Sequence, residues 1–460
     1  MKRLSLIVAA TAGISAYGVM RASRRAANQR MRQPAPETAP RIVVLGGGFG
    51  GMTAVEALAE RLPGRAQILL IDRHNYHLFT PMLYEAATCA VVPSDIAYPL
   101  RQCTGPHGAD FRRADVRGVD FERRRVLLAD GEVSFDYLVI ALGSTTSFFG
   151  NDAAQRNTLE LKQLEDGIAM RNRVVDMLEQ ASTALDPVLR ASMLTFVIVG
   201  GGATGVETAG ALADLLQRII PLEYPHLDVH QARVIVVDAA PKLLGHMSSR
   251  MADIALRELR KMSVDVRLNT TAKAVEAGHL TLSDGDTISA QTIVWAAGVQ
   301  APEIVAKLDA PHGPKGSLEV DEYLQVRERP GVYAVGDSAH IQDSRTHEPI
   351  PLLAAAAEQE GRAVARNIAR SIAGRRPFAF RYRDLGNVVA LGHRTGVALV
   401  GGVLVDGVAG WLTWRLVHLA RITSFRSKLA TVLDWTVGYL YDEDTARLEI
   451  EPSYRAQRVA

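Results

Sequence analysis

The stretch Arg41–Met52, RIVVLGGGFGGM, decides how this chain folds. Its four apolar residues Ile42–Leu45 indicate a buried parallel strand, and they run directly into a Gly-x-Gly-x-x-Gly pattern that begins at Gly46. In this pattern the first glycine permits a tight turn, the second lets a pyrophosphate approach the backbone, and the third lets a helix pack on the strand. Thr53–Arg61 indicates that helix, whose N-terminal N–H groups would face the phosphates. The stretch therefore predicts a dinucleotide-binding unit.

A second strand and an acidic residue complete this unit. Gln67–Ile71 is a mainly apolar strand followed by Asp72, about 20 residues past the last glycine, where an acid takes the ribose hydroxyls of a dinucleotide. Arg113–Tyr137 then alternates polar and apolar residues around the turn Asp130-Gly131, which predicts a β-meander. Tyr137–Ser144, YLVIALGS, predicts another buried strand that ends in glycine.

The opening signature occurs a second time in the chain. Phe196–Glu207, FVIVGGGATGVE, again joins an apolar strand to a Gly-x-Gly-x-x-Gly pattern, here beginning at Gly200, and to a helix. Two such units in one chain predict two dinucleotide sites. The second acid is Asp238, which follows the strand Arg233–Val237 after a longer interval than usual. Pro221 and Pro225 are expected to mark a loop that absorbs the extra residues.

The residue type at Asp238 also indicates which nicotinamide cofactor binds. A carboxylate there accepts hydrogen bonds from a 2′-hydroxyl and repels a 2′-phosphate. The next residues, Ala239 and Ala240, supply no arginine to neutralise a phosphate. The sequence therefore favours NADH over NADPH.

Three later stretches extend the α/β pattern. Thr292–Val299 should close the second unit, and Gly331–Asp337 is a short strand that ends in Gly-Asp. Pro351–Ala373 predicts an alanine-rich helix, with Gly374 just past its end.

Length and composition limit the possible functions. The chain has 460 residues, enough for two or three domains. Its formal net charge of +2 argues against a nucleic-acid-binding protein, which needs a concentrated basic surface. The two cysteines, Cys89 and Cys103, form no CxxC pair, so neither a dithiol motif nor a cysteine-rich zinc site is predicted. His74 and His77 are interpreted as structural, and no metal site is expected.

The N-terminus carries a hydrophobic segment. Leu4–Met20 is uncharged and lies at the short limit for a bilayer span, which needs roughly 17–25 residues. A signal peptide is the alternative. The arginines that follow, from Arg21 onward, favour an uncleaved anchor with that side in the cytoplasm. The Pro-rich stretch Gln33–Pro40 is predicted to be a spacer.

The character of the chain changes again near its C-terminus. A helical projection places an apolar set on one face, with Trp414 and Arg421 on the opposite side; the apolar residues are Trp411, Leu412, Leu416, Leu419 and Ile422. Charged residues interrupt this segment too often for a membrane span. The pattern predicts a helix that lies in the lipid headgroup region. A core helix with snorkelling arginines, or a dimer interface, are the alternatives.

Taken together, these motifs resemble the type II NADH:quinone oxidoreductases, over roughly Arg41 to Leu448. The segments that carry the resemblance are VVLGGGFGG, HLFTPMLYEAAT, YLVIALGS, LKQLEDGIAMRNRV, VIVGGGATGVE, WAAGV, YAVGD and the tail with Trp411, Trp414, His418 and Asp434-Trp435. The resemblance implies an α/β fold of two Rossmann-like domains, for FAD and NADH, followed by C-terminal amphipathic membrane-associating helices. The implied domains are residues 41–160 and 300–385 for FAD, 161–299 for NADH, and 386–460 for the membrane or dimer region, after an N-terminal segment 1–40.

The resemblance also implies roles for particular residues. Those expected at FAD are Gly46, Gly48, Gly50, Gly51, Asp72, Gly143, Gly336 and Asp337. Those expected at NADH are Gly200, Gly202, Gly205, Asp238 and Gly298. Glu207 corresponds to the family's glutamate beside the isoalloxazine and nicotinamide, where it positions or relays protons.

The chain departs from the family at the expected quinone site. The family usually shows AQxxxQ on the helix beneath the flavin, whereas the matching stretch here has Ala355 in place of the first glutamine. Only Gln359 remains as the expected contact to a quinone carbonyl.

The expected activity is hydride transfer from NADH to FAD, followed by delivery of two electrons to a membrane quinone without proton pumping. The expected place is the respiratory chain at the cell membrane, with the catalytic domain on the cytoplasmic side and the protein a homodimer. One alternative is a ferredoxin or rubredoxin type of reductase, which would not explain the aromatic tail. A sulfide:quinone oxidoreductase would need reactive cysteines beside the flavin. A low-turnover redox-sensing flavoprotein is separated from the enzyme by NADH oxidation with and without a quinone.

Overall fold

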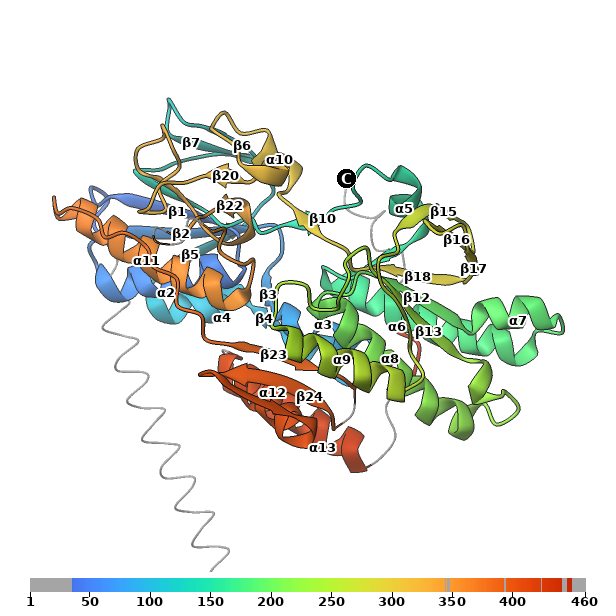
Figure 1. The fold of residues 1–460 in the computed structure, drawn as a ribbon. Coiled ribbons are helices and arrows are strands. Elements are labelled where there is room, and N and C mark those ends of the chain that lie inside the picture. Colours follow the sequence, from blue (N-terminus) through green and yellow to red (C-terminus); the bar gives the residue numbers. More distant parts are fainter. Residues whose placement is uncertain are drawn as a thin grey trace, which may run out of the picture. The chain divides into compact units, whose positions relative to one another are not determined.

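The computed structural model describes residues 35–343, 345, 348–392, 394–422, 424–440 and 445–448 (Figure 1). Within these ranges the chain forms two compact units, each built from segments that are separated in the sequence. Unit 1 contains the chain up to His77, Pro99–Ser144 and Gln300–Asp384. Unit 2 contains Leu78–Tyr98, Thr145–Val299 and the chain from Leu385 onward.

Unit 1 is organised around a five-stranded parallel sheet with the order β21-β9-β1-β2-β5. The strands are β1 (Arg41–Leu45), β2 (Gln67–Asp72), β5 (Asp110–Arg113), β9 (Tyr137–Ile140) and β21 (Val332–Ala334). The side chains of residues 42–45 are completely buried, as expected for an apolar strand covered on both faces. The β-meander predicted from the sequence is present as β6 (Val116–Asp120), β7 (Arg125–Leu128) and β8 (Gly131–Ser134).

Two helices pack closely together in unit 1, namely α2 (Phe49–Arg61) and α11 (Ala354–Ile372). A Cβ atom added at Gly361 of α11 would lie 2.4 Å from the carbonyl oxygen of Gly50, so the helices meet at a distance that only glycine allows. The predicted start of α2 at Thr53 was wrong, because the helix begins at Phe49, immediately after the glycine turn.

Unit 2 repeats this arrangement. Its parallel sheet has the order β11-β18-β12-β13-β14, and a three-stranded antiparallel sheet again accompanies it. The strands are β11 (Leu159–Glu160), β12 (Thr195–Val199), β13 (Arg233–Val237), β14 (Asp265–Arg267), β15 (Ala272–Glu276), β16 (His279–Leu282), β17 (Thr287–Ser289) and β18 (Thr292–Trp295). The duplication predicted from two glycine motifs therefore extends to the order of the strands.

The helix after the second glycine turn is α8 (Ala203–Glu223), with 21 residues against 13 in α2. Pro221 lies inside its last turn, so the expectation that this proline belongs to a loop was wrong. The extra residues before Asp238 lengthen the helix first, and the loop that includes Pro225 takes up the remainder.

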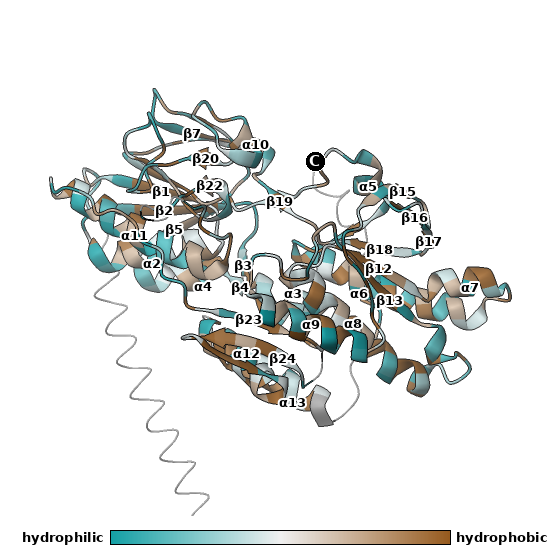
Figure 2. Cartoon of the chain, viewed as in Figure 1, coloured by the Kyte–Doolittle hydropathy of each residue, from teal (hydrophilic) through white to brown (hydrophobic). Residues whose placement is uncertain are grey.

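The C-terminal part of unit 2 is an antiparallel sheet followed by two helices. The elements are β23 (Asn387–Ala390), β24 (Gly396–Val400), β25 (Val403–Asp406), α12 (Gly407–Arg421) and α13 (Phe425–Leu440). α12 packs on β24 and buries Gly410, Trp414 and His418, one residue per turn along one face. Leu412 and Leu416 of the predicted apolar face are 48% and 66% exposed. Figure 2 shows apolar residues along both α12 and β24.

The remaining helices and strands connect these elements. They are β3 (Tyr76–Leu78), α3 (Leu83–Ala87), β4 (Ala97–Pro99), α4 (Leu100–Thr104), β10 (Thr145–Thr146), α5 (Asp152–Asn157), α6 (Leu164–Thr183), α7 (Pro187–Met193), α9 (Ser249–Lys261), β19 (Val299–Gln300), α10 (Glu303–Ala306), β20 (Leu318–Glu319) and β22 (Ala339–His340). Across the described ranges, no helix is both long and apolar enough to cross a bilayer. The predicted anchor Leu4–Met20 lies outside these ranges.

Candidate functional site

The glycine turn of unit 1 has the shape that a phosphate group needs. Gly46 has a φ of +101°, and a Cβ atom there would lie 2.1 Å from the carbonyl oxygen of Ala141. A Cβ atom on Gly51 would lie 1.9 Å from the carbonyl oxygen of Gly46. Gly48, in contrast, faces open space. Packing therefore requires the first and third glycines, while the second leaves the helix N-terminus accessible to a ligand.

The acid of unit 1 is fixed beside this turn. The backbone N–H of Gly47 donates to Asp72 Oδ2 at 2.6 Å, and the backbone N–H of His74 donates to Asp72 Oδ1 at 2.7 Å. The buried His77 bonds the Gly47 carbonyl through Nδ1 at 2.8 Å, and burial lowers the pKa of its imidazole. The backbone N–H groups of Gly47 and His74 thus hold Asp72 at the carboxyl end of β2, where ribose hydroxyls bind in this fold.

The ends of β9 and β21 supply the other residues predicted in unit 1. Ser144 Oγ donates to Asp337 Oδ2, and Ser338 Oγ donates to the carbonyl of Gly143 at 3.1 Å. Gly143 and Gly336 have positive φ values of +70° and +63°. Gly143, Gly336 and Asp337 are therefore brought together at the carboxyl edge of the sheet, the edge that binds ligands in open α/β sheets.

Glu360 is a buried acid that the sequence reasoning missed. It lies on α11, and its Oε2 accepts the backbone N–H of Gly336 at 2.6 Å. Burial raises the pKa of Glu360 to about 7, with a smaller contribution from the charge of Asp337. The resemblance to the family points to its neighbour Gln359. A glutamate one position further along an alanine-rich helix carries no sequence signal of its own.

Unit 2 reproduces the turn and its acid atom for atom. Gly200 has a φ of +116°, and a Cβ atom on Gly205 would lie 1.8 Å from its carbonyl oxygen. The backbone N–H of Gly201 donates to Asp238 Oδ2, and that of Ala240 donates to Asp238 Oδ1 at 2.6 Å. These bonds match those that Asp72 accepts in unit 1. The second turn can therefore hold the same kind of ligand as the first.

A cavity of about 930 Å³ opens in front of the second turn. Its lining includes Gly200, Gly202, Asp238, Thr270, Trp295 and Gly298. A volume of this size is within the range of small-molecule and cofactor sites. Gly298 has a φ of +80°, and a Cβ atom there would lie 2.6 Å from Cζ of Phe149, another lining residue. The absence of a side chain at Gly298 therefore makes room for the aromatic wall of the cavity.

Glu207 is the one predicted catalytic acid, and it is buried within unit 2. Trp414 Nε1 of α12 donates to its Oε1 at 2.8 Å, and the backbone N–H of Ala390 donates to the same oxygen at 3.1 Å. Burial raises the pKa of Glu207 to about 8, and the charge of Glu85 raises it further while the two hydrogen bonds lower it. The carboxyl group therefore carries a proton at neutral pH.

Aromatic residues surround this carboxyl group. The Trp414 ring stacks on His418 with 4.1 Å between centroids, and the Tyr84 ring meets it edge-on at 5.8 Å. Burial lowers the pKa of His418 to about 4, so its imidazole is neutral. Glu85 and Arg415 line a cavity together with Tyr84 and Trp414, and both were missed. For Glu85 the reason is that nothing in HLFTPMLYEAAT shows which distant helix covers this segment.

Gln359, the predicted quinone contact, is bonded within unit 1. Its Nε2 donates to the carbonyl of Arg383 at 3.0 Å and to that of Ala355 at 3.1 Å. Its Oε1 accepts the backbone N–H of Arg383, also at 3.0 Å. In this arrangement both ends of the amide bind backbone groups.

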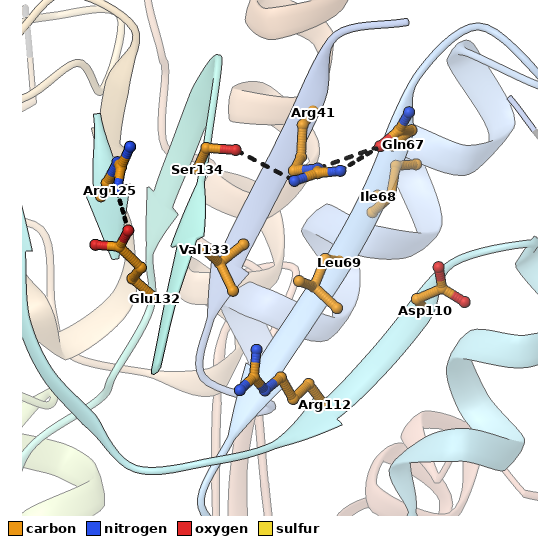
Figure 3. Close-up of a pocket in the computed structure, with 10 residues that line it drawn as sticks. All are labelled: Arg41, Gln67, Ile68, Leu69, Asp110, Arg112, Arg125, Glu132, Val133 and Ser134. Atoms are coloured by element: carbon orange, nitrogen blue, oxygen red, sulfur yellow. Dashed lines mark hydrogen bonds and ion pairs between the residues drawn. The ribbon is translucent and has the colours of Figure 1, made fainter. Parts of the chain in front are cut away.

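A further groove of about 530 Å³ lies at the other edge of the unit 1 sheet (Figure 3). Arg41, at the start of β1, donates to Gln67 Oε1 at 3.0 Å and to Ser134 Oγ at 3.2 Å. Arg125 and Glu132 form an ion pair nearby. Ligands of open parallel sheets bind at the carboxyl ends of the strands, so this groove is separate from the cofactor residues.

Comparison with known proteins identifies the family. Residues 40–361 match the family described as pyridine nucleotide-disulphide oxidoreductase. The type II NADH:quinone oxidoreductase Ndh of Mycobacterium tuberculosis is 32% identical over 421 residues, which cover 88% of this chain and 89% of that protein. The chain belongs to the type II NADH:quinone oxidoreductase family. The resemblance seen in the sequence motifs is thus confirmed.

Other matches agree with this assignment. Demethylphylloquinone reductase NdbB of Synechocystis is 31% identical, with 88% of this chain and 97% of that protein covered. The solved structure of NDH2 from Plasmodium falciparum in complex with NADH superimposes with a TM-score of 0.82 at 17% identity, covering 88% of this chain and 99% of that one. This structure shows that a type II NADH:quinone oxidoreductase shares the α/β fold described above.

Proposed function

We propose that the protein is an NADH:quinone oxidoreductase of the type II class, which transfers hydride from NADH to FAD and two electrons onward to a membrane quinone without pumping protons. The observation that carries this proposal is the duplicated turn. Asp72 and Asp238 accept the same pair of backbone N–H bonds in two separate Rossmann-like units of one chain. A protein with two dinucleotide sites is suited to moving electrons from one nucleotide to another.

FAD fits the residues of unit 1. Its pyrophosphate would lie over the N-terminus of α2 at Gly48, where there is open space, and Asp72 would accept the ribose hydroxyls. Asp337 would bond the ribityl chain beside Gly143 and Gly336. When bound, FAD supplies the capacity to accept a hydride and to release two electrons. Gly50 would act through the contact of α2 with α11.

NADH fits the cavity of unit 2. The pyrophosphate would lie over Gly202 at the N-terminus of α8, and Asp238 would accept bonds from the adenosine ribose. The negative charge of Asp238 disfavours the 2′-phosphate of NADPH. Glu207 lies on α8, the helix that begins at the second glycine turn. It would donate its carboxyl proton during the reaction and then recover one.

Gln359 remains the proposed contact for one quinone carbonyl. To bind it, the Gln359 amide would exchange one of its bonds to Arg383 for the quinone oxygen. Ala355 cannot form a second bond of this kind. The quinone is therefore held by fewer polar contacts than in family members that carry both glutamines.

The C-terminal helices of unit 2 are proposed to lie on the lipid surface. Several large apolar side chains of α12 and α13 are more than one-third exposed; they are Val408, Leu412, Leu416, Phe425, Leu429, Val432, Leu433 and Val437. A second copy of the chain could cover part of this set, and a homodimer is proposed. The proposed location is the cytoplasmic side of the cell membrane. The proposed domain limits are those that the resemblance implies: residues 41–160 and 300–385 for FAD, 161–299 for NADH, and 386–460 for the membrane or dimer region.

Anaerobic stopped-flow spectroscopy tests the function directly. The purified protein should be yellow, NADH should bleach the flavin absorbance, and menaquinone or ubiquinone analogues should restore it. Protein that stays colourless after reconstitution with FAD, or flavin that NADH does not bleach, would contradict the proposal. Reoxidation of the flavin by an electron-carrier protein of low reduction potential, such as a ferredoxin, but by neither quinone analogue, would favour the reductase alternative.

A further inference from the structure

Phe149 of unit 2 has a backbone conformation that phenylalanine rarely adopts. Its φ is +52°, in the left-handed region, and the next residue, Gly150, has a φ of +79°. The backbone N–H of Asn151 donates to the carbonyl of Phe148 at 2.9 Å and closes a four-residue turn. Positive φ values at both central positions make this a type I′ turn, whose first central position favours asparagine, aspartate or glycine. A bulky aromatic side chain at that position is strained.

Both ends of this turn are anchored. The Phe148 side chain is buried, and its ring packs on that of Trp295 with 5.5 Å between centroids. At the other end, Asn151 Oδ1 accepts the backbone N–H of Ala154 at 2.9 Å and caps the first turn of α5. The surrounding structure therefore holds Phe149 in its strained conformation. Strain that is held in place in this way concentrates at binding and catalytic sites.

Packing of the Phe149 side chain does little to offset this strain, because the residue is 66% exposed. Its ring contacts Gly298: a Cβ atom added there would lie 2.6 Å from Cζ of Phe149 and 3.4 Å from Cε2. Phe149 also lines the cavity of about 930 Å³ in front of the second glycine turn. An aromatic ring that is fixed at the wall of a cofactor-sized cavity, with most of its surface uncovered, is placed to contact a ligand.

The order of the strands shows which part of a dinucleotide this ring would meet. In the unit 2 sheet, β12 lies between β18 and β13. The glycine turn follows β12, Asp238 follows β13, and Gly298 follows β18. Asp238 is the proposed partner of the adenosine ribose, and the glycine turn is the proposed partner of the pyrophosphate. Gly298 and the Phe149 ring on it therefore lie on the nicotinamide side of the pyrophosphate.

We propose that Phe149 is a positioning residue for NADH, whose ring stacks on the nicotinamide half of the bound dinucleotide. This rests on the proposed function, and in particular on the binding of NADH in the unit 2 cavity. Stacked aromatic rings contribute to affinity beyond the area that they bury. The anchored turn fixes the ring before the ligand arrives, so little binding free energy is lost in ordering it. The same residue therefore lowers the stability of unit 2 and raises its affinity for the cofactor.

Phe149→Asn separates this role from a structural one. The substitution removes the ring and supplies the Asn-Gly pair that type I′ turns favour. The midpoint of thermal unfolding of the FAD-loaded protein should therefore rise by about 2 °C. The Kd for NAD⁺, which cannot reduce the flavin, should rise about three- to tenfold in isothermal titration calorimetry on the oxidised holoenzyme. A lower unfolding midpoint with an unchanged Kd would show a packing role and overturn the inference.

ADP is the probe that locates the contact along the dinucleotide. It carries the adenosine ribose and the pyrophosphate but lacks the nicotinamide half. Its Kd for the Phe149→Asn holoenzyme should therefore stay within about twofold of the wild-type value. Equal losses of affinity for ADP and NAD⁺ would overturn the assignment of Phe149 to the nicotinamide half.

Further variants keep the test decisive if Phe149→Asn folds poorly. Phe149→Leu keeps an apolar side chain in the strained conformation but removes the flat ring, so affinity for NAD⁺ should fall without a rise in the unfolding midpoint. Phe149→Tyr keeps the ring and should retain most of the affinity.

Ser263→Asn is the matched control for relief of strain. Ser263 is an exposed residue of unit 2 with a φ of +61°, and it does not line the cavity. This variant should raise the unfolding midpoint and leave both Kd values unchanged. Wild-type affinity for NAD⁺ in both Phe149→Asn and Phe149→Leu would overturn the inference. Failure of the proposed function would look different, because the wild type itself would bind neither NAD⁺ nor ADP.

Discussion

Glu207 keeps its proton because the protein removes it from water without giving it a cationic partner. Its two hydrogen bonds come from an indole and a backbone amide, both neutral donors, and both fall on Oε1. Neutral donors stabilise a carboxylate less than a charged partner does, so burial dominates and the pKa rises to about 8. At the scale of one residue, the environment makes a glutamate into a proton donor at neutral pH.

Glu207→Gln should slow quinone reduction by about 100-fold, because the amide cannot donate a carboxyl proton. FAD content should stay at the wild-type level, since Glu207 lies outside unit 1. In the wild type, the protonated donor form of Glu207 predominates well below pH 8 and is lost as pH rises through about 8, so turnover should fall on the alkaline side. Steady-state rates across this range, with flavin absorbance as the control, check the prediction. Equal losses of flavin and turnover would contradict it.

Asp238 determines the choice of nicotinamide through its charge. Asp238→Asn combined with Ala239→Arg should raise the kcat/KM for NADPH relative to NADH by at least about tenfold, because repulsion of the 2′-phosphate is replaced by a bidentate cationic partner. Asp238→Asn alone is the matched control, since it keeps an oxygen for the turn and removes the charge. Rates of flavin reduction by each nucleotide give the ratio. An unchanged preference in the double variant would refute the specificity argument.

At the scale of elements, the strands and glycine turns could be predicted because they depend on neighbours in sequence. RIVVL and FVIV contain their own burial pattern, and the first and third glycines contain the steric requirement of their turns. The start of α2 and the end of α8 depend on how the turn and the proline fit locally, and both were misplaced. Glu85 and Glu360 could not be predicted, because α13 and the end of β21 supply their partners from far along the chain.

The contact between α2 and α11 permits a direct test of element packing. Gly361→Ala places a methyl group 2.4 Å from the Gly50 carbonyl oxygen and should lower stability by about 1–3 kcal/mol. Because α2 begins at the glycine turn, FAD should also dissociate more readily. Gly105→Ala, at a site with open space around it, is the control. Thermal unfolding with and without added FAD measures both effects, and a Gly361→Ala protein as stable as this control would contradict the prediction.

At the scale of the whole molecule, the proposal concerns contact with a membrane. The apolar residues of α12 and α13 and the segment Leu4–Met20 are two separate candidates for attachment. Helical periodicity correctly placed Trp414 opposite Leu412 and Leu416, but it put Ile422 on the same apolar face, and Ile422 is buried at 1% exposure. It also could not show that Trp414 bonds Glu207 of α8 in the same unit. The exposed face therefore follows from the fold and not from periodicity alone.

Leu412→Glu with Leu416→Glu should weaken binding to phospholipid vesicles, since two carboxylates replace exposed apolar side chains. In a protein that starts at residue 35, we expect the fraction bound in vesicle sedimentation to fall at least about tenfold. The same change in the full chain should have a smaller effect if Leu4–Met20 anchors it. Leu185→Glu, at an exposed residue before α7, is the control. Undiminished binding by the shortened double variant would exclude this face as a lipid contact.

One turn of α12 carries both a buried hydrogen-bond donor and an exposed apolar side chain. Trp414 and Leu416 are two positions apart on a single helical turn, with the indole bonded to Glu207 and the leucine facing outward. A helical turn is stiff, so a force that tilts its outer side also displaces the indole. If this outer side contacts lipid as proposed, a tilt of the helix there would change the hydrogen bond from Trp414 to Glu207, and with it the pKa of that carboxyl group.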